Sequence, residues 1–218
     1  MIFLRQEWKK SELMKLIFAT NNQHKTDEVR SAIKAHTFLE IITLREAGID
    51  LDIPEPYATL EENASNKSRT IYELTKTNTL AIGCFSEDTG LDVEALNGEP
   101  GVKSARYAGE EKSFEKNIDK LLRKLEGNSN RKARFRTIIS LIINEREHSF
   151  EGICPGTITD HRRGGAGFGY DPVFVPDGAI HTFAEMDMEE KNRFSHRKKA
   201  IDKLVKYLSE EFSPEKAR

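Results

Sequence analysis

The stretch Lys15-Leu16-Ile17-Phe18-Ala19-Thr20-Asn21-Asn22-Gln23-His24-Lys25 decides the fold of this 218-residue chain. Its first six residues form a short apolar run that is typical of a buried strand, and Asn21-Asn22 ends that run. From Lys25 onward, Val29 and Ile33 recur at helical spacing. The stretch therefore predicts a strand, a polar turn and a helix.

The next segments predict a loop and a long helix. Residues 48–58 carry two prolines among acidic residues, which favours a surface loop. Thr59 and Glu62 have the spacing of a capping box, so we expect a helix from there to about Thr77, with Lys67 on it. The apolar face of this helix is expected to hold Leu60, Ala64, Ile71 and Leu74.

Further strands and helices follow toward the C-terminus. Residues 79–85 read as a second buried strand, and residues 133–143 and 149–156 as two strands that pair in a hairpin around residues 144–147. A helix is expected over residues 114–125. Ser195 can cap a closing helix whose apolar face consists of Ile201, Leu204, Val205 and Leu208.

The overall composition indicates one folded domain without a nucleic-acid or membrane partner. A formal net charge of -2 gives no basic field for polyanions, and no apolar stretch approaches the roughly 20 residues of a membrane span. Cys84 and Cys154 are far apart, which fits a reducing cytoplasm better than a disulfide framework. We expect a single domain over residues 14–218, preceded by a polar extension at residues 1–13.

Two polar clusters can serve a phosphorylated ligand. Thr20, Asn22 and Lys25 lie where a strand meets a helix, and free backbone N–H groups at such a junction bind anions. The plain alternative is a helix cap with a solvated lysine. Glu55 and Asp88 offer the hard oxygen ligands that magnesium prefers, although the sequence Asp88-Thr89-Gly90 is also ordinary turn chemistry.

Two later clusters can recognise a base. Residues 164–172 combine glycines, which permit close backbone approach, with Phe168 and Tyr170, which offer stacking faces; a tight turn with a core phenylalanine is the alternative. Lys191 and Arg197 can only donate hydrogen bonds, so against a purine they favour a carbonyl at the six-position over an amine. Taken alone, they would more often form a solvated basic surface.

Taken together and in order, these segments resemble the inosine triphosphate pyrophosphatase family, and the resemblance runs from about residue 15 to residue 208. It implies an α/β fold in which an elongated mixed sheet with flanking helices forms two lobes around a central nucleotide-binding cleft, usually in a homodimer. The segments that carry it are residues 19–25 with Glu28, Glu62-Asn63-Ala64 with Lys67, residues 87–91, residues 100–107, residues 167–172, and Ser195-His196-Arg197.

The same resemblance implies Mg²⁺-dependent hydrolysis of ITP, dITP and XTP to the monophosphate and pyrophosphate. Glu55 and Asp88 would bind the metal, and Asp88 would orient or deprotonate the attacking water. Many bacterial relatives carry two aspartates where this chain has Glu87-Asp88, so we assign the metal to Asp88 rather than Glu87. The substrate-binding positions are then Thr20, Asn22, Lys25 and Lys67 for the triphosphate, Thr89, and Phe168, Gly169, Tyr170, Asp171, Lys191, His196 and Arg197 around the base. Ser104, Ala105 and Arg106 look like structural or subunit-contact positions.

Two other functions stay open at this stage. A pyrophosphatase of the same architecture could act on pyrimidine or modified nucleotides, because fold and substrate are weakly linked. A nucleotide-binding regulator without turnover is the other, although such a protein has less need of a carboxylate that orients water.

Overall fold

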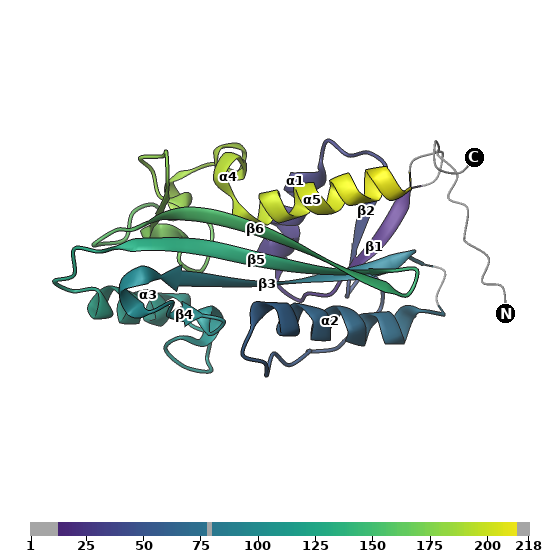
Figure 1. Cartoon of the computed structure of the whole chain (residues 1–218), viewed down its shortest axis with the longest axis horizontal. Helices are drawn as coiled ribbons and strands as arrows, with labels where there is room; N and C mark the ends of the chain where they lie inside the picture. The colour runs from purple at the N-terminus through teal and green to yellow at the C-terminus, as the bar shows by residue number, and fades with distance from the viewer. Residues whose placement is uncertain (1–12, 78–79, 213–218) are drawn as a thin grey trace.

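A long mixed sheet runs the length of the molecule (Figure 1). The computed structural model describes residues 13–77 and 80–212. The strands lie in the order β2 (Leu39–Thr43), β1 (Met14–Phe18), β3 (Gly83–Val93), β5 (Lys132–Ile143), β6 (Arg146–Ile158) and β7 (Phe174–Pro176), with the short β4 (Pro100–Gly101) paired to β3. Strand β1 is parallel to β2 and β3, and the remaining pairs are antiparallel. The predicted elongated α/β fold with a mixed sheet is confirmed.

Helices cover both faces of this sheet (Figure 1). Helices α1 (Gln23–Ile33) and α5 (His196–Glu211) pack on one face, where Phe18 and Phe85 stack at 4.5 Å between ring centroids. Helix α2 (Leu60–Thr75) packs on the other face against Cys84. The alternation of side chains along β3 thus divides the core into two layers. The shorter helices are α3 (Phe114–Lys124), α4 (Met188–Phe194) and the 3₁₀ turns η1 (Glu94–Leu96), η2 (Ser104–Arg106), η3 (Asp171–Val173) and η4 (Phe183–Glu185).

Side-chain caps hold the three helices that surround the site, and those at Thr59 and Ser195 were predicted. Asn22, Thr59 and Ser195 each accept a hydrogen bond from the backbone N–H three residues later, at 3.2 Å in all three cases. The apolar face of α5 is buried as predicted, and residues 48–58, all of them described, contain no helix or strand. The starts of α2 and α5 are therefore confirmed, whereas α1 begins at Gln23 and not at Lys25.

Three predictions are wrong or fall outside the described residues. Strand β3 does not end at Phe85 but continues to Val93, while its predicted start at Thr79 lies outside the described residues. Leu74 is 59% exposed because it lies in the last turn of α2. The extension over residues 1–13 is described only at Leu13.

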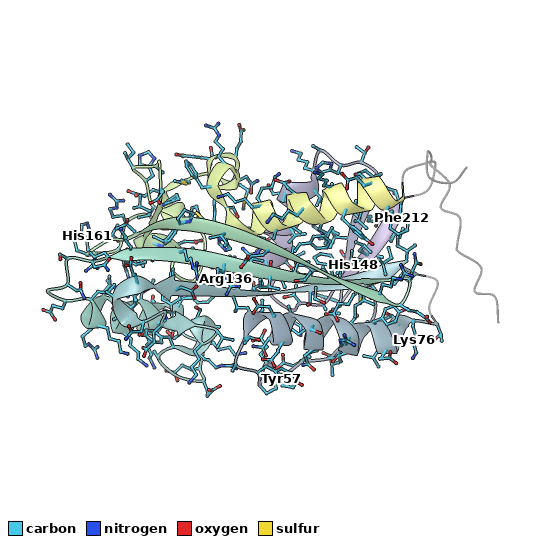
Figure 2. All side chains as sticks on the ribbon, in the orientation of Figure 1. Tyr57, Lys76, Arg136, His148, His161 and Phe212 are labelled. Atoms are coloured by element: carbon cyan, nitrogen blue, oxygen red, sulfur yellow. The ribbon has the colours of Figure 1, made fainter. Side chains whose placement is uncertain are left out.

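The predicted hairpin is present and is longer than expected. Strands β5 and β6 pair over their full length around a two-residue turn, Asn144-Glu145, whose φ angles are 49° and 63°. Close to this turn, His148 meets the Tyr207 hydroxyl of α5 at 2.9 Å (Figure 2). Near the middle of the sheet, Arg136 forms ion pairs with Glu61 of α2 and Glu151 of β6. The hairpin is thereby tied to helices on both faces.

No helix within the described residues combines the length and the apolar character that crossing a membrane demands.

Gly152 lets the start of α5 lie directly on β6. A Cβ atom at this position would stand 1.9 Å from the His196 carbonyl oxygen and 2.6 Å from the Ala200 nitrogen. Since both atoms belong to a helix backbone, they cannot move aside as a flexible side chain would. Gly152 therefore sets the height of α5, and of His196 and Arg197, above the sheet.

We expect Gly152→Ala to destabilise the protein by about 1–3 kcal/mol, because the added methyl group forces α5 away from β6. Chemical denaturation measures the loss. Gly165→Ala is the control, since a Cβ atom there would meet nothing within 4 Å. Equal stability of the two variants would contradict the close contact.

Candidate active site

The candidate site lies where β3 has a gap along one edge. Strand β1 pairs with β3 as far as Phe85, and β4 pairs with it only from Leu91 onward. Residues 86–90 lie between these two pairings, and two of them, Asp88 and Thr89, line a cleft of about 390 Å³. The sheet is continuous on the other side, where every residue of β3 pairs with β5. A strand held along one whole edge therefore carries Asp88 to the cleft.

Adjacent carboxylates on β3 point to opposite faces of the sheet. Glu87 reaches toward α1 and α5, where it contacts Lys25 and Arg197. Asp88 reaches toward α2, where Lys67 Nζ lies 3.6 Å from its Oδ1. The period of two in a strand thus gives these neighbours different environments.

The N-terminus of α1 forms one wall of the cleft. Asn22 caps the helix through its side-chain oxygen, and its own N–H donates to Thr20 Oγ1 at 3.2 Å. Lys25 is not solvated as the plain alternative supposed: its side chain is 16% exposed and its Nζ lies 3.2 Å from Glu87 Oε1. Backbone N–H groups, a hydroxyl and an ammonium group therefore converge, as anion binding requires.

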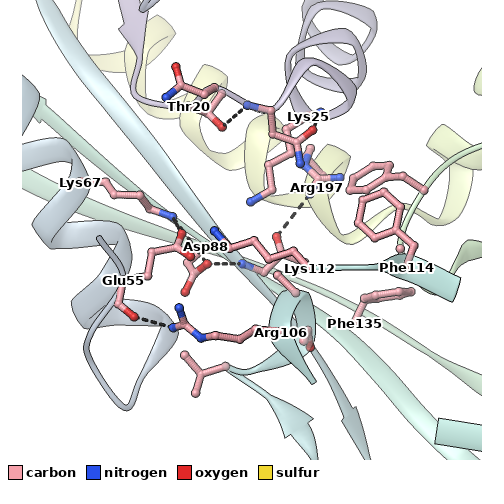
Figure 3. A pocket seen from close by; sticks show the side chains of 18 of the residues that line it. Thr20, Lys25, Glu55, Lys67, Asp88, Arg106, Lys112, Phe114, Phe135 and Arg197 are labelled. Carbon is pink, nitrogen blue, oxygen red and sulfur yellow. Dashed lines mark hydrogen bonds and ion pairs between the residues drawn. The ribbon is translucent and has the colours of Figure 1, made fainter. Parts of the chain in front are cut away.

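Glu55, Lys67 and Asp88 form a second group on the α2 side of the cleft (Figure 3). Lys67 donates a short hydrogen bond to Glu55 Oε1. Asp88 Oδ2 is buried and has no hydrogen-bond partner among the described residues. An orphaned carboxylate oxygen beside a second carboxylate is a suitable environment for a hard cation.

Burial and charge shift the pKa values of this group in different directions. Burial raises the pKa of Asp88, and the Lys67 charge offsets this only in part. For Glu55, burial also raises the pKa, but the nearby Lys67 outweighs it and the net pKa is lowered. The Asp88 and Glu55 charges outweigh burial at Lys67 and raise its pKa. Lys67 therefore stays charged, and Asp88 is the carboxyl held closest to protonation.

The loop that carries Glu55 is held by its backbone. The Asn63 side chain, which is 0% exposed, accepts from the Tyr57 N–H at 3.0 Å and donates to the Tyr57 carbonyl at 3.3 Å. Asn66 donates to the Pro54 carbonyl at 3.1 Å, and Arg106 donates to the Glu55 carbonyl. Side chains from α2 and η2 thus fix a loop that has no regular structure of its own.

The far end of the cleft contains a buried network of charges. Lys191 donates to Glu28 and to Asp171, at 2.6 Å in each case. Arg197 is 2% exposed and donates to Glu87 through Nε at 2.6 Å and Nη2 at 2.8 Å, and to Glu28 through Nη1. Burial would raise the pKa of Glu28, but the Arg197 and Lys191 charges outweigh it and lower the pKa to about 2. Lys191 and Arg197 are therefore not the solvated basic surface of the plain alternative.

Aromatic rings line the same end of the cleft. His196 stacks on Phe135 at 4.6 Å, and its Nδ1 is buried without a hydrogen-bond partner. Burial, reinforced by the Arg197 charge, lowers the pKa of His196 well below its usual range, so the ring is neutral. Phe168 is half-buried and stacks on His24 at 5.1 Å. Phe135, Phe168 and His196 thus give this end of the cleft an aromatic lining.

Gly167 is required by the turn that presents Phe168. Its φ is +75°, and a Cβ atom there would stand 2.1 Å from Asp171 Oδ2. That oxygen accepts the Phe168 N–H at 2.9 Å, so the glycine lets the loop close on Asp171. Tyr170 is buried in the neighbouring core and donates to the Ser104 carbonyl at 2.9 Å.

Every residue that the sequence assigned to the site lines this one cleft. The set comprises Thr20, Asn22, Lys25, Glu55, Lys67, Asp88, Thr89, Phe168, Gly169, Tyr170, Asp171, Lys191, His196 and Arg197. The structure adds Arg106, which had been interpreted as a structural or subunit-contact position, together with Lys112, Phe114 and Phe135 (Figure 3). Glu28 belongs to the buried charge network through its contacts with Lys191 and Arg197. In the sequence, only its place in the same motif as Lys25 pointed to it.

A metal cage made of protein ligands alone is not found. Among the described residues, no three His, Cys, Asp or Glu side chains are grouped closely enough to hold a metal ion. Magnesium needs fewer protein ligands, because it keeps several waters and commonly binds one or two carboxylates with substrate phosphates.

Comparison with known proteins gives a consistent result over nearly the whole chain. The sequence model of the Ham1 family matches residues 16–207. A dITP/XTP pyrophosphatase of Flavobacterium psychrophilum is 44% identical over 195 residues, which cover 89% of this chain and 99% of the relative. The solved Ham1 protein of Staphylococcus aureus has a TM-score of 0.78 and 38% identity, covering 90% of this chain and 99% of its own. A HAM1 protein from Coxiella burnetii has a TM-score of 0.80 and 34% identity over 91% and 100% of the two chains.

The lowered pKa of Glu28 predicts acid sensitivity. Since this pKa falls from 4.5 to about 2 on folding, its contribution to stability is fully present above pH 4.5 and is lost as the pH falls through about 2. The contribution is about 3 kcal/mol. We expect Glu28→Gln to be less stable than wild type in urea unfolding near neutral pH, and the two curves to converge in acid. Parallel pH profiles of stability for wild type and Glu28→Gln would contradict this expectation. Glu189→Gln is the control, because the Glu189 side chain is 87% exposed.

Proposed function

We propose that this chain, which belongs to the Ham1 family, hydrolyses non-standard purine nucleoside triphosphates such as ITP, dITP and XTP. The products would be the monophosphate and pyrophosphate, and the role would be to cleanse the nucleotide pool. Relatives with the name dITP/XTP pyrophosphatase support this over about nine-tenths of the chain. The observation that carries the proposal is the buried Asp88 carboxylate, whose Oδ2 has no partner among the described residues, in a cleft that is also lined by the N-terminus of α1 and by Phe168, His196 and Phe135.

The triphosphate would lie along the wall formed by the N-terminus of α1. Thr20 and the first backbone N–H groups of α1 donate to phosphate oxygens, and Lys25 and Lys67 supply positive charge. Arg106 and Lys112 line the same part of the cleft and add to this charge. A highly charged substrate needs such compensation before water can approach phosphorus.

Glu55 and Asp88 would hold Mg²⁺. The fit rests on hard carboxylate oxygens, on the unpartnered Asp88 Oδ2 and on a cleft open to substrate phosphates. When bound, Mg²⁺ supplies charge neutralisation for the phosphates and lowers the pKa of a coordinated water.

Asp88 also suits the role of orienting or deprotonating the attacking water. Its pKa is raised by burial, which brings a carboxylate closer to the working pH of a general base. The attack would be on the α-phosphorus, with pyrophosphate leaving toward Lys25 and Lys67. Because Lys67 pairs with Glu55 and approaches Asp88, it also keeps the two carboxylates from repelling each other.

The base would enter the slot formed by Phe168, His196 and Phe135. Most donors of Lys191 and Arg197 are taken by Glu28, Asp171 and Glu87, which leaves a small number of N–H groups for the six-position of a purine. A carbonyl accepts from these donors, whereas the amine of adenine opposes them and leaves buried groups unpaired, at a cost of about 1–3 kcal/mol.

We also propose a homodimer that works in the cytoplasm. The dimer rests on the family resemblance of the sequence. The compartment rests on Cys84 and Cys154, which are both buried as free thiols, as is usual in a reducing environment.

The direct test is pyrophosphate release from ITP, XTP, ATP, GTP and dTTP with Mg²⁺ or with EDTA. We expect release from ITP and XTP that EDTA abolishes. Activity confined to dTTP would favour the pyrimidine alternative, and a folded protein that is silent on every substrate would favour the regulator.

We expect Asp88→Asn to lower turnover of ITP by roughly 10²–10⁴-fold, the range attributed to general bases. Because burial already disfavours the ionised Asp88, the neutral amide should leave the free energy of unfolding unchanged or slightly higher. Steady-state kinetics and urea unfolding measure the two effects. Near-normal turnover would remove Asp88 from the mechanism, and Asp92→Asn, on the same strand, is the control.

A further inference from the structure

Glu87 is a buried carboxylate that the proposed reaction does not use. Its side chain is 1% exposed, and it lies next to Asp88 on β3 but faces the opposite side of the sheet. Both oxygens are engaged: Oε2 accepts from Arg197 Nε, and Oε1 accepts from Arg197 Nη2 and lies near Lys25 Nζ. No free oxygen remains to bind a metal, so the residue needs another explanation.

The contacts of Glu87 join the two ends of the cleft. Arg197 comes from α5 and belongs to the base end, whereas Lys25 comes from α1 and belongs to the phosphate end. The Arg197 pair is bidentate, at 2.6 Å and 2.8 Å, and the Lys25 distance is 3.2 Å. One carboxylate therefore touches cations from two helices that otherwise serve different parts of a nucleotide.

Each cation needs such an anchor for a different reason. A two-pronged acceptor fixes the plane of a guanidinium group, and that plane decides which N–H faces the base. An ammonium group sits on a flexible four-carbon stem, so a carboxylate at one side limits the positions that it occupies. A pair buried merely for stability would be weakly justified, because desolvation cancels much of the attraction.

We propose that Glu87 is a positioning residue that holds Lys25 for the triphosphate and Arg197 for the base, and so couples recognition at the two ends. The inference rests on the proposed function, since it takes the ligand to be a purine nucleotide. A purely structural Glu87 would alter the stability of the protein without altering the relative affinity for two bases.

The test uses Glu87→Gln, which keeps the shape and removes the charge, with Glu87→Asp as the conservative variant. Calorimetry with inorganic triphosphate reports the Lys25 end. The ratio of the affinities for IMP and AMP reports the Arg197 end, because the phosphate is common to both ligands. In Glu87→Gln we expect triphosphate binding and the IMP-to-AMP ratio each to fall about tenfold. Glu87→Asp should recover part of both.

Glu147→Gln is the matched control. Glu147 is a partly buried carboxylate that accepts from Ser140 at 2.7 Å and pairs with Arg69 away from the cleft. The Glu147→Gln variant should leave both triphosphate binding and the IMP-to-AMP ratio unchanged. A folded Glu87→Gln protein that changes only one readout, or neither, overturns the proposal.

A second measurement applies if Glu87→Gln does not fold. Lys25→Met, Arg197→Lys and the double variant retain the carboxylate, and the same two readouts are taken. Both cations share Oε1 of Glu87, so we expect their effects on each readout to be coupled. The loss in the double variant should therefore differ from the product of the two single-variant losses. Independent losses overturn the coupling.

The binding readouts do not require turnover. A wild-type protein that releases no pyrophosphate from ITP but binds IMP would count against the proposed function and leave the Glu87 inference standing. A wild-type protein that binds neither inorganic triphosphate nor IMP would overturn both.

Discussion

The edge of β3 between Phe85 and Leu91 determines where the rest of the site lies. Strand β1 stops at Phe18, and β4 takes up the edge only at Leu91, so the cleft opens at Asp88 and Thr89 between them. Pairing with β5 along the whole of β3 keeps this opening rigid. The N-terminus of α1 enters at the same place because α1 follows β1 directly. The alternation of the strand then sends Glu87 and Asp88 to opposite sides, so that adjacent residues would serve different ends of the proposed ligand.

The two sides of β3 manage buried charge differently. On the α1 and α5 side, Glu28, Glu87 and Asp171 pair with Lys25, Lys191 and Arg197, and the pKa values of Glu28 and Glu87 are lowered because these cations outweigh burial, whereas burial raises the pKa of Asp171. On the α2 side, Asp88 has a raised pKa and an oxygen without a partner among the described residues. The buried cations of the first side are thus paired with carboxylates of the protein itself, whereas Asp88 retains an oxygen for a ligand. In the proposed function, this difference separates recognition of the base from chemistry at phosphorus.

Local signals in the sequence predicted the starts of α2 and α5, whereas the predicted site residues, all of which line the cleft, came from the family resemblance. Thr59 and Ser195 act within one turn of their own backbone, so their spacing was informative. The length of β3 was not predictable in the same way, because Glu87 and Asp88 are poor strand formers until Arg197 and Lys67, distant in sequence, pair with them. The same holds for Glu28: it lies on the buried face of α1, but its partners come from α4 and α5. Interactions at long sequence separation account for most of what the sequence could not reveal.

The balanced charges of the base end also restrict how this protein can change over evolutionary time. Replacement of one of Glu28, Glu87, Asp171, Lys191 or Arg197 strands a partner's charge in the interior, at a cost of roughly 3–5 kcal/mol for a buried pair. Compensation at a neighbouring position would relieve that cost, so mutations here are epistatic and gradual drift through single steps is penalised. Selection for a new base would therefore proceed more readily through the aromatic slot, where size and shape vary without leaving an ion unpaired.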